Sequence, residues 1–277
     1  MIIDGKLVRD KKLEELKKII NKLDRQLGLA VIQVGSDEAS NVYIKQKEKY
    51  ANELGYKFIH LKYDETIGED ILLDKIDELN NDSSIDGILV QMPLPHHLDE
   101  NKIQNRISSS KDVDGLTYMN AGKLVNNNQG LRPCTPKGII DLLDYYNIPI
   151  EGSNAVVIGR SILVGKPIAN LLLNRNATVT ICHSKTKDLA SITKKADILV
   201  VAIGKKWFVD KSMIKKGSTI IDVGINRDDG KLYGDVNFDD VKDKCKYITP
   251  VPGGVGPMTV LELMYNVYEA FLLNNVK

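Results

Sequence analysis

The sequence is poor in the residues that build disulfide frameworks and metal centres. It has three cysteines and four histidines among 277 residues, and no two cysteines form a CxxC pair. An odd, sparse set of cysteines is typical of a reducing compartment, so no disulfide framework is expected. The histidines show neither the spacing of metal ligands nor that of a catalytic triad, and we therefore expect no metal site.

The sequence also lacks an excess of either charge and any long apolar run. Its 38 lysines and arginines balance 37 aspartates and glutamates, which gives no indication of a nucleic-acid partner or an anionic membrane surface. No uncharged apolar run is long enough to span a membrane, and residues 1–12 lack the apolar core of a signal peptide. We expect a cytoplasmic protein.

The sequence contains instead an alternation of strand patterns and helix patterns. Near-continuous apolar runs alternate with amphipathic stretches, which is typical of α/β folds whose parallel sheets are covered on both faces. The length and the 43% of hydrophobic residues suffice for two cores. The apolar runs span residues 28–35, 56–63, 86–95, 154–161, 178–184, 197–204 and 218–225, and the helical patterns span roughly 11–26, 38–54, 68–80, 136–147, 165–175 and 258–275.

Two segments bear on how the predicted units are joined. The polar stretch 119–133 is rich in asparagine and indicates a connection between two α/β units. The last helical pattern has one apolar face, so this helix must pack against another element. It covers its own unit or crosses back to the first one, and the pattern leaves both possibilities open.

The stretch AVVIGRSILVGKP, residues 155–167, has the context of a dinucleotide-binding loop. An apolar strand ends at Gly159, and a helix with proline in its first turn follows, so the helix N-terminus would face a phosphate. Arg160 and Ser161 stand where a second glycine is usual. The loop is either a ligand-free strand–glycine–helix turn, which is common, or one built for a different phosphate.

The end of the next predicted strand distinguishes NADP from NAD. A cofactor with a free ribose 2′-hydroxyl usually meets an aspartate or glutamate there. This strand ends in CHSKT, residues 182–186, without a carboxylate. Ser184 offers a hydroxyl, and the nearby Arg160 offers a planar cation suited to a phosphate. The pattern favours NADP. Lys185 is either a further cation for the phosphate or a loop lysine exposed to solvent.

One lysine lies on the apolar face of a predicted helix over residues 37–55. At about 100° per residue, Lys47 falls one turn after Tyr43 and one turn before Tyr50. Either its stem packs while its ammonium group reaches water, or it is a desolvated amine whose lowered pKa lets it act as a base near neutral pH. The other residues predicted on this face are Ala39, Ile44, Ala51 and Leu54.

Two further kinds of polar residue stand beside apolar runs. Gln91 is the only hydrogen-bonding side chain in the strand pattern 87–95, which ends in prolines. It either orients a neighbouring amine at the exposed strand end or is satisfied by loop backbone. Asp112 and Asp114 lie in a turn-like stretch. They either form Asx turns or face a pocket and accept N–H groups from a ligand.

The segment TPVPGGVGPMT, residues 249–259, contains three prolines and three glycines. This composition is too stiff for a flexible linker. Fixed φ angles at the prolines and bare backbone at the glycines predict a rigid wall that a flat ligand can approach closely.

Together and in this order, these motifs resemble the bifunctional methylenetetrahydrofolate dehydrogenase/cyclohydrolase family, and the resemblance covers nearly the whole chain. The loop GRSILVGKP and the segment PVPGGVGPMT are the most specific motifs. The sequence departs from the family pattern at Met92, where leucine is more usual, and at Asn237, where aspartate is common. The other motifs that carry the resemblance are VGSDEASNVYIKQK, GILVQMPLP, KDVDGLT, RPCTPKG, CHSKT and IDVGINR.

The resemblance implies two α/β domains with a cleft between them. A folate-binding catalytic domain would comprise residues 1–136 plus 258–277, and a Rossmann-type NADP-binding domain would comprise residues 137–257. The terminal helix would return to the first domain, and the protein would be a homodimer through the cofactor domains. The implied activity belongs to one-carbon metabolism: NADP-dependent oxidation of 5,10-methylenetetrahydrofolate to the 5,10-methenyl compound, and hydrolysis of that compound to 10-formyltetrahydrofolate.

The resemblance also implies roles for the residues singled out above. Lys47 would transfer protons in the hydrolysis while Gln91 holds its amine. Tyr43 would lie against the pterin, and Asp114 would accept its N–H groups. The folate side of the cleft would be lined by Gly253 and Gly254. The cofactor would be bound by Gly159, Arg160 and Ser161 at its phosphates, by Ser184 at its 2′-phosphate and by the backbone of Ile225 at its nicotinamide.

Two other functions fit parts of the sequence. A related two-domain NADP dehydrogenase acting on a small acid of the shikimate type would leave Tyr43, Lys47, Gln91 and the proline–glycine wall without a joint purpose. A redox-sensing regulator with a dinucleotide domain usually carries a DNA-binding or effector module, but no basic helix-turn-helix pattern stands out in the sequence.

We predict that Arg160→Ala weakens the binding of NADP far more than that of NAD, because the guanidinium pairs with the phosphate that only NADP carries. Titration calorimetry with each cofactor measures the two dissociation constants. Equal losses would place Arg160 at the pyrophosphate instead.

Overall fold

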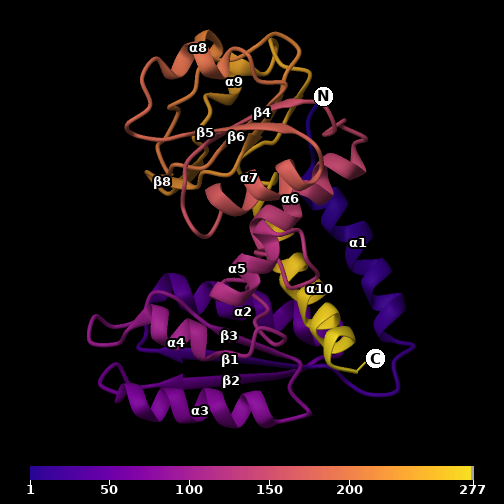
Figure 1. The fold of residues 1–277 in the computed structure, drawn as a ribbon, viewed down its shortest axis with the longest axis vertical. Coiled ribbons are helices and arrows are strands. Elements are labelled where there is room, and N and C mark those ends of the chain that lie inside the picture. The colour runs from indigo at the N-terminus through magenta and orange to yellow at the C-terminus, as the bar shows by residue number, and fades with distance from the viewer. Residues whose placement is uncertain (276–277) are drawn as a thin grey trace. The chain divides into compact units, whose positions relative to one another are not determined.

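The structure, a computed structural model, describes residues 1–275, with only the backbone of Ala39. The chain forms two compact units, each with its own parallel sheet (Figure 1). The first residues of the chain belong with the larger sheet because the N–H of Ile3 donates to the carbonyl oxygen of Ile248 at 2.8 Å. The three-stranded unit comprises residues 12–134 and 260–275, and the five-stranded unit comprises residues 1–11 and 135–259.

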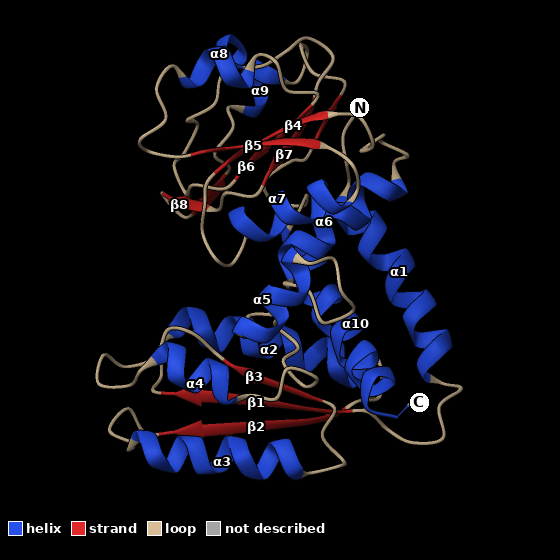
Figure 2. Ribbon diagram, in the orientation of Figure 1, coloured by secondary structure: helices blue, strands red, loops and turns tan. Residues whose placement is uncertain are grey.

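The sheet of the three-stranded unit has the strand order β2-β1-β3, with all strands parallel (Figure 2). The central strand β1 (Gly28–Val34) is buried along its length, as its continuous apolar pattern requires. The edge strand β2 (Lys57–Tyr63) is partly exposed, and β3 (Gly87–Val90) is buried. The carboxyl ends of β1 and β3 are neighbours at one edge of the sheet, where ligands bind in open α/β folds.

The core of this unit explains why its helices form where they do. Ile32 of β1 and Ile88 of β3 belong to one apolar cluster with Leu72 and Ile76, which are four residues apart on α3 (Glu69–Asn81). Spacing of three to four residues puts apolar side chains on one helix face, so α3 packs against the sheet by that face.

The sheet of the five-stranded unit has the order β10-β7-β6-β4-β5 and is also parallel. Its first strand in the chain, β4, lies between β5 and β6, so later strands extend the sheet in both directions. This reversal opens a crevice at the carboxyl ends of β4 and β6. The strands are β4 (Asn154–Ile158), β5 (Thr178–Cys182), β6 (Ile198–Val201), β7 (Thr219–Asp222) and β10 (Tyr247–Ile248), with a separate antiparallel hairpin of β8 (Asn226–Asp228) and β9 (Lys231–Tyr233).

The last helix, α10 (Gly256–Asn275), crosses back to the three-stranded unit, which decides the question that the sequence left open. The hydroxyl of Tyr56 donates to Met264 O at 3.0 Å, and the side-chain amide of Asn266 donates to Val113 O at 2.7 Å. The remaining helices are α1 (Gly5–Ile20), α2 (Glu38–Glu53), α4 (Glu100–Arg106), α5 (Tyr118–Val125), α6 (Cys134–Tyr145), α7 (Gly165–Asn174), α8 (Leu189–Thr193), α9 (Phe238–Val241) and the 3₁₀ helix Lys211–Met213.

The polar stretch 119–133 is not the connection between the units that its composition indicated. Its first part belongs to α5, and the chain passes to the five-stranded unit only after Cys134. The buried amide of Asn120 donates to Ser109 O at 2.8 Å and to Asp112 Oδ2 at 2.9 Å. This asparagine therefore holds neighbouring loops together. Its polar character alone indicated a solvated linker, so composition did not reveal this role.

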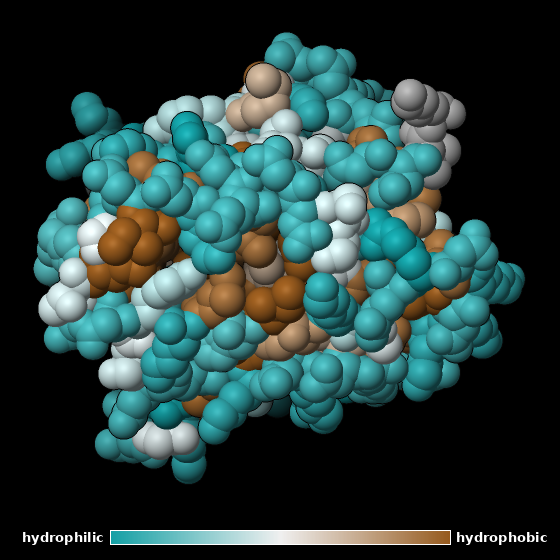
Figure 3. Space-filling model, turned by 90° about the horizontal axis from the view of Figure 1, so that it is seen from below, coloured by the Kyte–Doolittle hydropathy of each residue, from teal (hydrophilic) through white to brown (hydrophobic). Residues whose placement is uncertain are grey.

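The surface of the protein is mainly hydrophilic, as expected when most apolar residues are internal. Figure 3 shows a face on which hydrophilic side chains predominate and hydrophobic ones form smaller groups. Within residues 1–275, no helix is both long enough and apolar enough to cross a membrane.

We predict that Asp86→Ala lowers the free energy of unfolding by about 2 kcal/mol, because a buried backbone donor would lose its acceptor. The carboxylate of Asp86 accepts the N–H of Gly28 at 2.9 Å and two bonds from Arg25 at 2.9 and 2.6 Å. Urea denaturation measures the change. Asp77→Ala, which removes an exposed ion pair with Arg106, is the control and should cost under about 1 kcal/mol. Equal losses in the two variants would contradict the prediction.

Candidate active site

Lys47 and Gln91 meet at the carboxyl edge of the three-stranded sheet. Lys47 lies on α2, the helix that follows β1, and its Nζ donates to Oε1 of Gln91 at 2.8 Å. Gln91 directly follows β3 and continues its pairing, since its N–H donates to Ile32 O at 2.8 Å. The side-chain NH₂ of Gln91 donates to Met92 O, also at 2.8 Å, so its oxygen is the atom turned to the lysine. Both alternatives for Gln91 hold: it is satisfied by loop backbone and it orients an amine.

The surroundings of Lys47 lower the pKa of its amine. The side chain is half-buried on a face whose neighbours Ile44, Ala51 and Leu54 are buried. Burial lowers the pKa of the Lys47 amine below its usual value, and the nearby Asp114 and Cys134 oppose this change only in part. Desolvation and a lowered pKa both agree with the second alternative for this lysine, and its action as a base stays a prediction.

The two aspartates of the turn have different environments. Asp112 is fully buried and accepts the N–H of Thr117 at 2.8 Å and the amide of Asn120 at 2.9 Å, so the structural alternative applies to it. Asp114 lies two residues further on, with the thiol of Cys134 at 3.9 Å. Burial raises the pKa of Asp114 to about 6, although the charge of Lys47 acts in the opposite direction. Asp114 is thus the carboxylate whose charge is coupled to the lysine.

Tyr43 lies one helical turn before Lys47, and its side chain is 48% exposed. The apolar face predicted for α2 is therefore buried at Ile44, Ala51 and Leu54 but open at Tyr43. An exposed aromatic ring beside a buried amine is available for stacking on a flat heterocycle.

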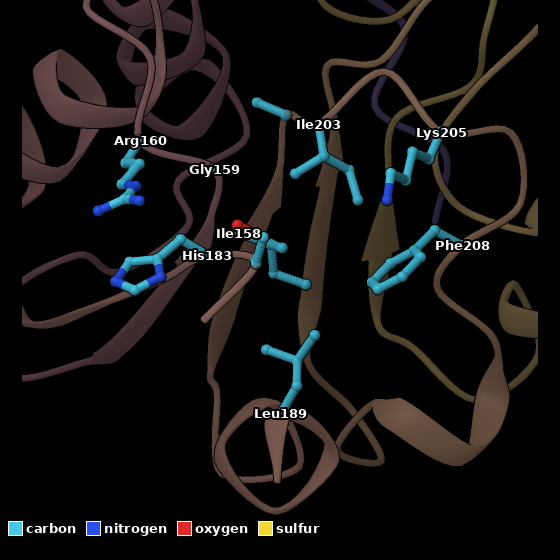
Figure 4. Close-up of a pocket in the computed structure, with 10 residues that line it drawn as sticks. Ile158, Gly159, Arg160, His183, Leu189, Ile203, Lys205 and Phe208 are labelled. Carbon is cyan, nitrogen blue, oxygen red and sulfur yellow. The ribbon is translucent and has the colours of Figure 1, made fainter. Parts of the chain in front are cut away.

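A pocket of about 320 Å³ lies at the carboxyl ends of β4, β5 and β6 in the five-stranded unit. Figure 4 shows Arg160 and His183 on one side of it and Lys205 and Phe208 on the other. Apolar side chains beside a guanidinium and a hydroxyl suit a flat ring system that carries a phosphate. The lining residues are Ile158, Gly159, Arg160, His183, Ser184, Leu189, Ala202, Ile203, Lys205 and Phe208.

The glycines of the predicted phosphate loop keep its backbone bare. Gly159 has a φ of 121°, and a Cβ on it would overlap Ala202 O at the neighbouring strand end. A Cβ on Gly165 would overlap Gly159 O, so this glycine lets α7 approach the strand. The hydroxyl of Ser161 accepts the N–H groups of Val164 at 3.1 Å and Gly165 at 3.2 Å. Ser161 thus holds the loop against the start of α7, and its predicted phosphate contact stays a prediction.

Three other predicted residues lie outside this pocket lining. Ile225 follows β7 by three residues and is 52% exposed. Gly253 has a φ of 106°, and its carbonyl oxygen accepts the N–H of Gly5 at 2.9 Å. The wall that includes Gly254 is thereby tied to the start of the chain, and the predicted ligand contacts of all three residues stay predictions.

Sequence reasoning missed Lys205, Phe208 and Leu189 in the pocket and Cys134 beside Asp114. Lys205 and Phe208 could have been found from the position of their loop, which directly follows β6 where the strand order reverses. Leu189 and Cys134 are ordinary apolar residues in sequence, and only the fold brings them to these sites.

Fold and pocket together define a two-unit α/β protein with a dinucleotide-type site. The model of the tetrahydrofolate dehydrogenase/cyclohydrolase catalytic domain matches residues 3–114, and the model of the NAD(P)-binding domain of that family matches residues 133–275. The bifunctional protein FolD of Thermodesulfovibrio yellowstonii is 54% identical over 280 residues, covering 99% of this chain and 98% of that protein. The chain belongs to the tetrahydrofolate dehydrogenase/cyclohydrolase family.

Solved structures agree with this membership. The bifunctional enzyme FolD of Campylobacter jejuni has a TM-score of 0.96 at 45% identity, with 99% of each chain covered. The Trypanosoma brucei FolD, complexed with NADP and an inhibitor, has a TM-score of 0.94 at 34% identity, covering 100% of this chain and 99% of that one. Shikimate 5-dehydrogenase of Thermus thermophilus, at 14% identity and a TM-score of 0.55 over 90% and 94% of the chains, shares the fold alone. The predicted family, fold class and NADP cofactor are confirmed.

We predict that Lys47 and Asp114 titrate as a coupled pair. Asp114→Asn should lower the pKa of Lys47 further, because the carboxylate charge now raises it. By the same coupling, Lys47→Met should raise the pKa of Asp114 above about 6. NMR titration of ¹³C-labelled lysine and aspartate side chains measures both changes.

The control for this titration is Glu53→Gln, which removes an exposed carboxylate from the end of α2. This substitution should leave the pKa of Lys47 unchanged. A Lys47 midpoint unmoved by Asp114→Asn would show that the two groups do not interact.

Proposed function

We propose that this chain catalyses both reactions of its family and that the two units divide the work. It oxidises 5,10-methylenetetrahydrofolate to 5,10-methenyltetrahydrofolate with NADP, then hydrolyses the product to 10-formyltetrahydrofolate. Residues 12–134 and 260–275 bind the folate, and residues 135–259 bind the cofactor. The contact between Lys47 Nζ and Gln91 Oε1 carries the proposal, because it places a buried amine where a hydrolysis needs a base.

The oxidation depends more on the positioning of the folate than on acid–base catalysis. The reacting carbon lies between two nitrogens, and a nitrogen lone pair stabilises the cation as hydride leaves. NADP supplies the hydride acceptor when it is bound. The chain contributes by holding the folate, with Tyr43 against the pterin and Asp114 accepting N–H groups from it.

The hydrolysis requires two proton transfers, and Lys47 carries them. Its neutral amine accepts a proton as water attacks the methenyl carbon. The resulting ammonium group returns a proton to the ring nitrogen that leaves when the ring opens, and the overall step adds one water and releases one proton. Gln91 is suited to this cycle because its neutral amide oxygen accepts a hydrogen bond from either form of the amine.

The pocket of the five-stranded unit is the site we assign to the adenosine part of NADP. Leu189, Ile203 and Phe208 provide apolar surface for a flat ring. Arg160 and Ser184 offer the fork and the hydroxyl that suit a 2′-phosphate. The Gly159 turn lets backbone approach the pyrophosphate, and Ile225 is assigned to the nicotinamide end.

A homodimer formed through the five-stranded unit is part of the proposal, as is a cytoplasmic location without a nucleic-acid partner. The edge strand β5 supports the dimer, because Ile181 on this strand is 41% exposed and Leu173 on α7 is 56% exposed. An open sheet edge beside exposed apolar side chains is typical of a surface that pairs with another chain.

The function is tested by adding methylenetetrahydrofolate and NADP to the protein and recording the absorbance of the mixture over time. Reduced cofactor should appear first, and the absorbance of the methenyl compound should then rise and decay. Reduction without decay would leave only the dehydrogenase, and no reduction would refute the proposal.

We predict that Lys47→Ala lowers the rate of methenyltetrahydrofolate hydrolysis by about 10²-fold or more, because general acid–base catalysis of this kind contributes that much. Folate affinity should change little, since Tyr43 and Asp114 remain. The rate is measured by the decay of the methenyl absorbance and the affinity by calorimetry.

Lys45→Ala is the matched control, since it removes an exposed lysine two residues away on the same helix. It should hydrolyse the methenyl compound at the rate of the unchanged protein. Hydrolysis retained by Lys47→Ala would remove this amine from the mechanism.

A further inference from the structure

Two buried aspartates lie behind the pocket of the five-stranded unit, in motifs that the reaction does not use. Asp222 ends β7 and is 3% exposed, and Asp235 follows β9 and is 0% exposed. A buried carboxylate is costly unless several donors satisfy it. The partners of these two groups show what the arrangement achieves.

The carboxylate of Asp235 accepts three consecutive backbone N–H groups, those of residues 203–205, in the turn that follows β6. Its Oδ2 accepts the N–H groups of Ile203 at 2.7 Å and Gly204 at 3.0 Å. Its Oδ1 accepts the N–H of Lys205 at 2.7 Å and the side-chain amide of Asn226 at 3.0 Å. Ile203 and Lys205 line the pocket, so one carboxylate determines the backbone of one pocket wall.

The rest of that wall is tied to the same segment by backbone bonds. The N–H of Trp207 donates to Gly234 O at 3.1 Å, and the N–H of Val209 donates to Asp235 O at 3.0 Å. Phe208, which lies between them, also lines the pocket. The turn from 203 to 209 is therefore held at both ends by residues 234 and 235.

Asp222 in turn holds Asp235. Its carboxylate accepts the N–H groups of Asp235 and Val236, both at 2.9 Å. Glycines make the room for this: a Cβ on Gly224 would overlap the carboxylate of Asp235, and a Cβ on Gly234 would overlap that of Asp222. The IDVG and GDV motifs thus encode one packed cluster.

We propose that Asp235 is a positioning residue for NADP, fixing through its carboxylate the turn 203–205 that forms one wall of the cofactor pocket, with Asp222 fixing Asp235. The inference rests on the assignment of NADP to this pocket. It identifies an affinity determinant that does not touch the cofactor. A neutral amide at position 235 cannot replace it, because its NH₂ group would face N–H donors.

The test is Asp235→Asn in the full-length enzyme. Calorimetry should show the dissociation constant of NADP raised by about tenfold or more, because buried donors in the turn lose their acceptors. The KM for NADP should rise while kcat changes little, as expected when binding is lost equally in ground and transition states. Hydrolysis of methenyltetrahydrofolate, which consumes no cofactor, should persist and shows that the three-stranded unit is intact. A cooperative urea transition of the variant shows that the five-stranded unit is folded.

Asp197→Asn is the matched control. Asp197 accepts the N–H of Asn154 at 2.9 Å and a bond from Lys215 at 2.6 Å, but it lies at the opposite end of β6. Its loss should leave the NADP affinity unchanged. A folded Asp235→Asn variant with unchanged NADP affinity would overturn the proposal. If neither Arg160→Ala nor Ser184→Ala changes the affinity for NADP, the assignment of NADP to this pocket is refuted instead.

A second pair of variants answers the question if Asp235→Asn does not fold. Gly204 and Gly230 have φ angles of 64° and 73°, and a Cβ on either would meet no atom within 4 Å. Alanine at each position introduces the same kind of backbone strain. Only Gly204→Ala alters the turn held by Asp235, so it alone should weaken NADP binding several-fold. Equal affinities in Gly204→Ala and Gly230→Ala would also overturn the proposal.

Discussion

The hydrogen bond between Lys47 and Gln91 is the constraint on which the proposed hydrolysis depends. A lysine in water keeps its proton at neutral pH because water stabilises the ammonium form. Burial of Lys47 on α2 removes part of this hydration. The partner must orient the amine without recharging it. A carboxylate at position 91 would favour the ammonium form, whereas the amide oxygen 2.8 Å away carries no net charge. Asp114 is near enough to oppose the effect of burial, so the site balances desolvation against one carboxylate.

Both units arrive at their sites by the same topological route. In each parallel sheet the first strand of the unit lies inside the sheet, as β1 does between β2 and β3 and β4 does between β5 and β6. The chain leaves such a strand in one direction and later returns to its other side. The residues that follow these strands then meet at one edge. Gln91 and Lys47 meet in this way in one unit, and the strand-end loops around Gly159 and Ile203 do so in the other.

Apolar periodicity predicted the interior well and the loops poorly. Each of the seven apolar runs contains a strand, but β10 and the β8–β9 hairpin have too few residues to give a pattern. Helix α1 begins at Gly5, six residues before its predicted start, because the carboxylate of Asp4 accepts the N–H groups of Lys6 and Leu7 in its first turn. The difference between Asp112 and Asp114 was not readable from the sequence, since it depends on which carboxylate the side chain of Asn120 reaches. The wall of the pocket in the five-stranded unit was missed for a related reason: Asp235 accepts bonds from backbone N–H groups, and these leave no trace in a pattern of side chains.

That reliance on main-chain donors has an evolutionary consequence. Every residue type except proline supplies the same N–H group, so the bonds from positions 203 and 205 to Asp235 do not depend on which side chains stand there. Side chains at positions 206 and 207, which are not among the residues that line the pocket, can vary while the path of the chain is kept. These positions hold a lysine and the protein's single tryptophan, and Lys206 Nζ lies 4.6 Å from the centroid of the Trp207 ring. The surface around this pocket can therefore change without any change in the backbone frame beneath it.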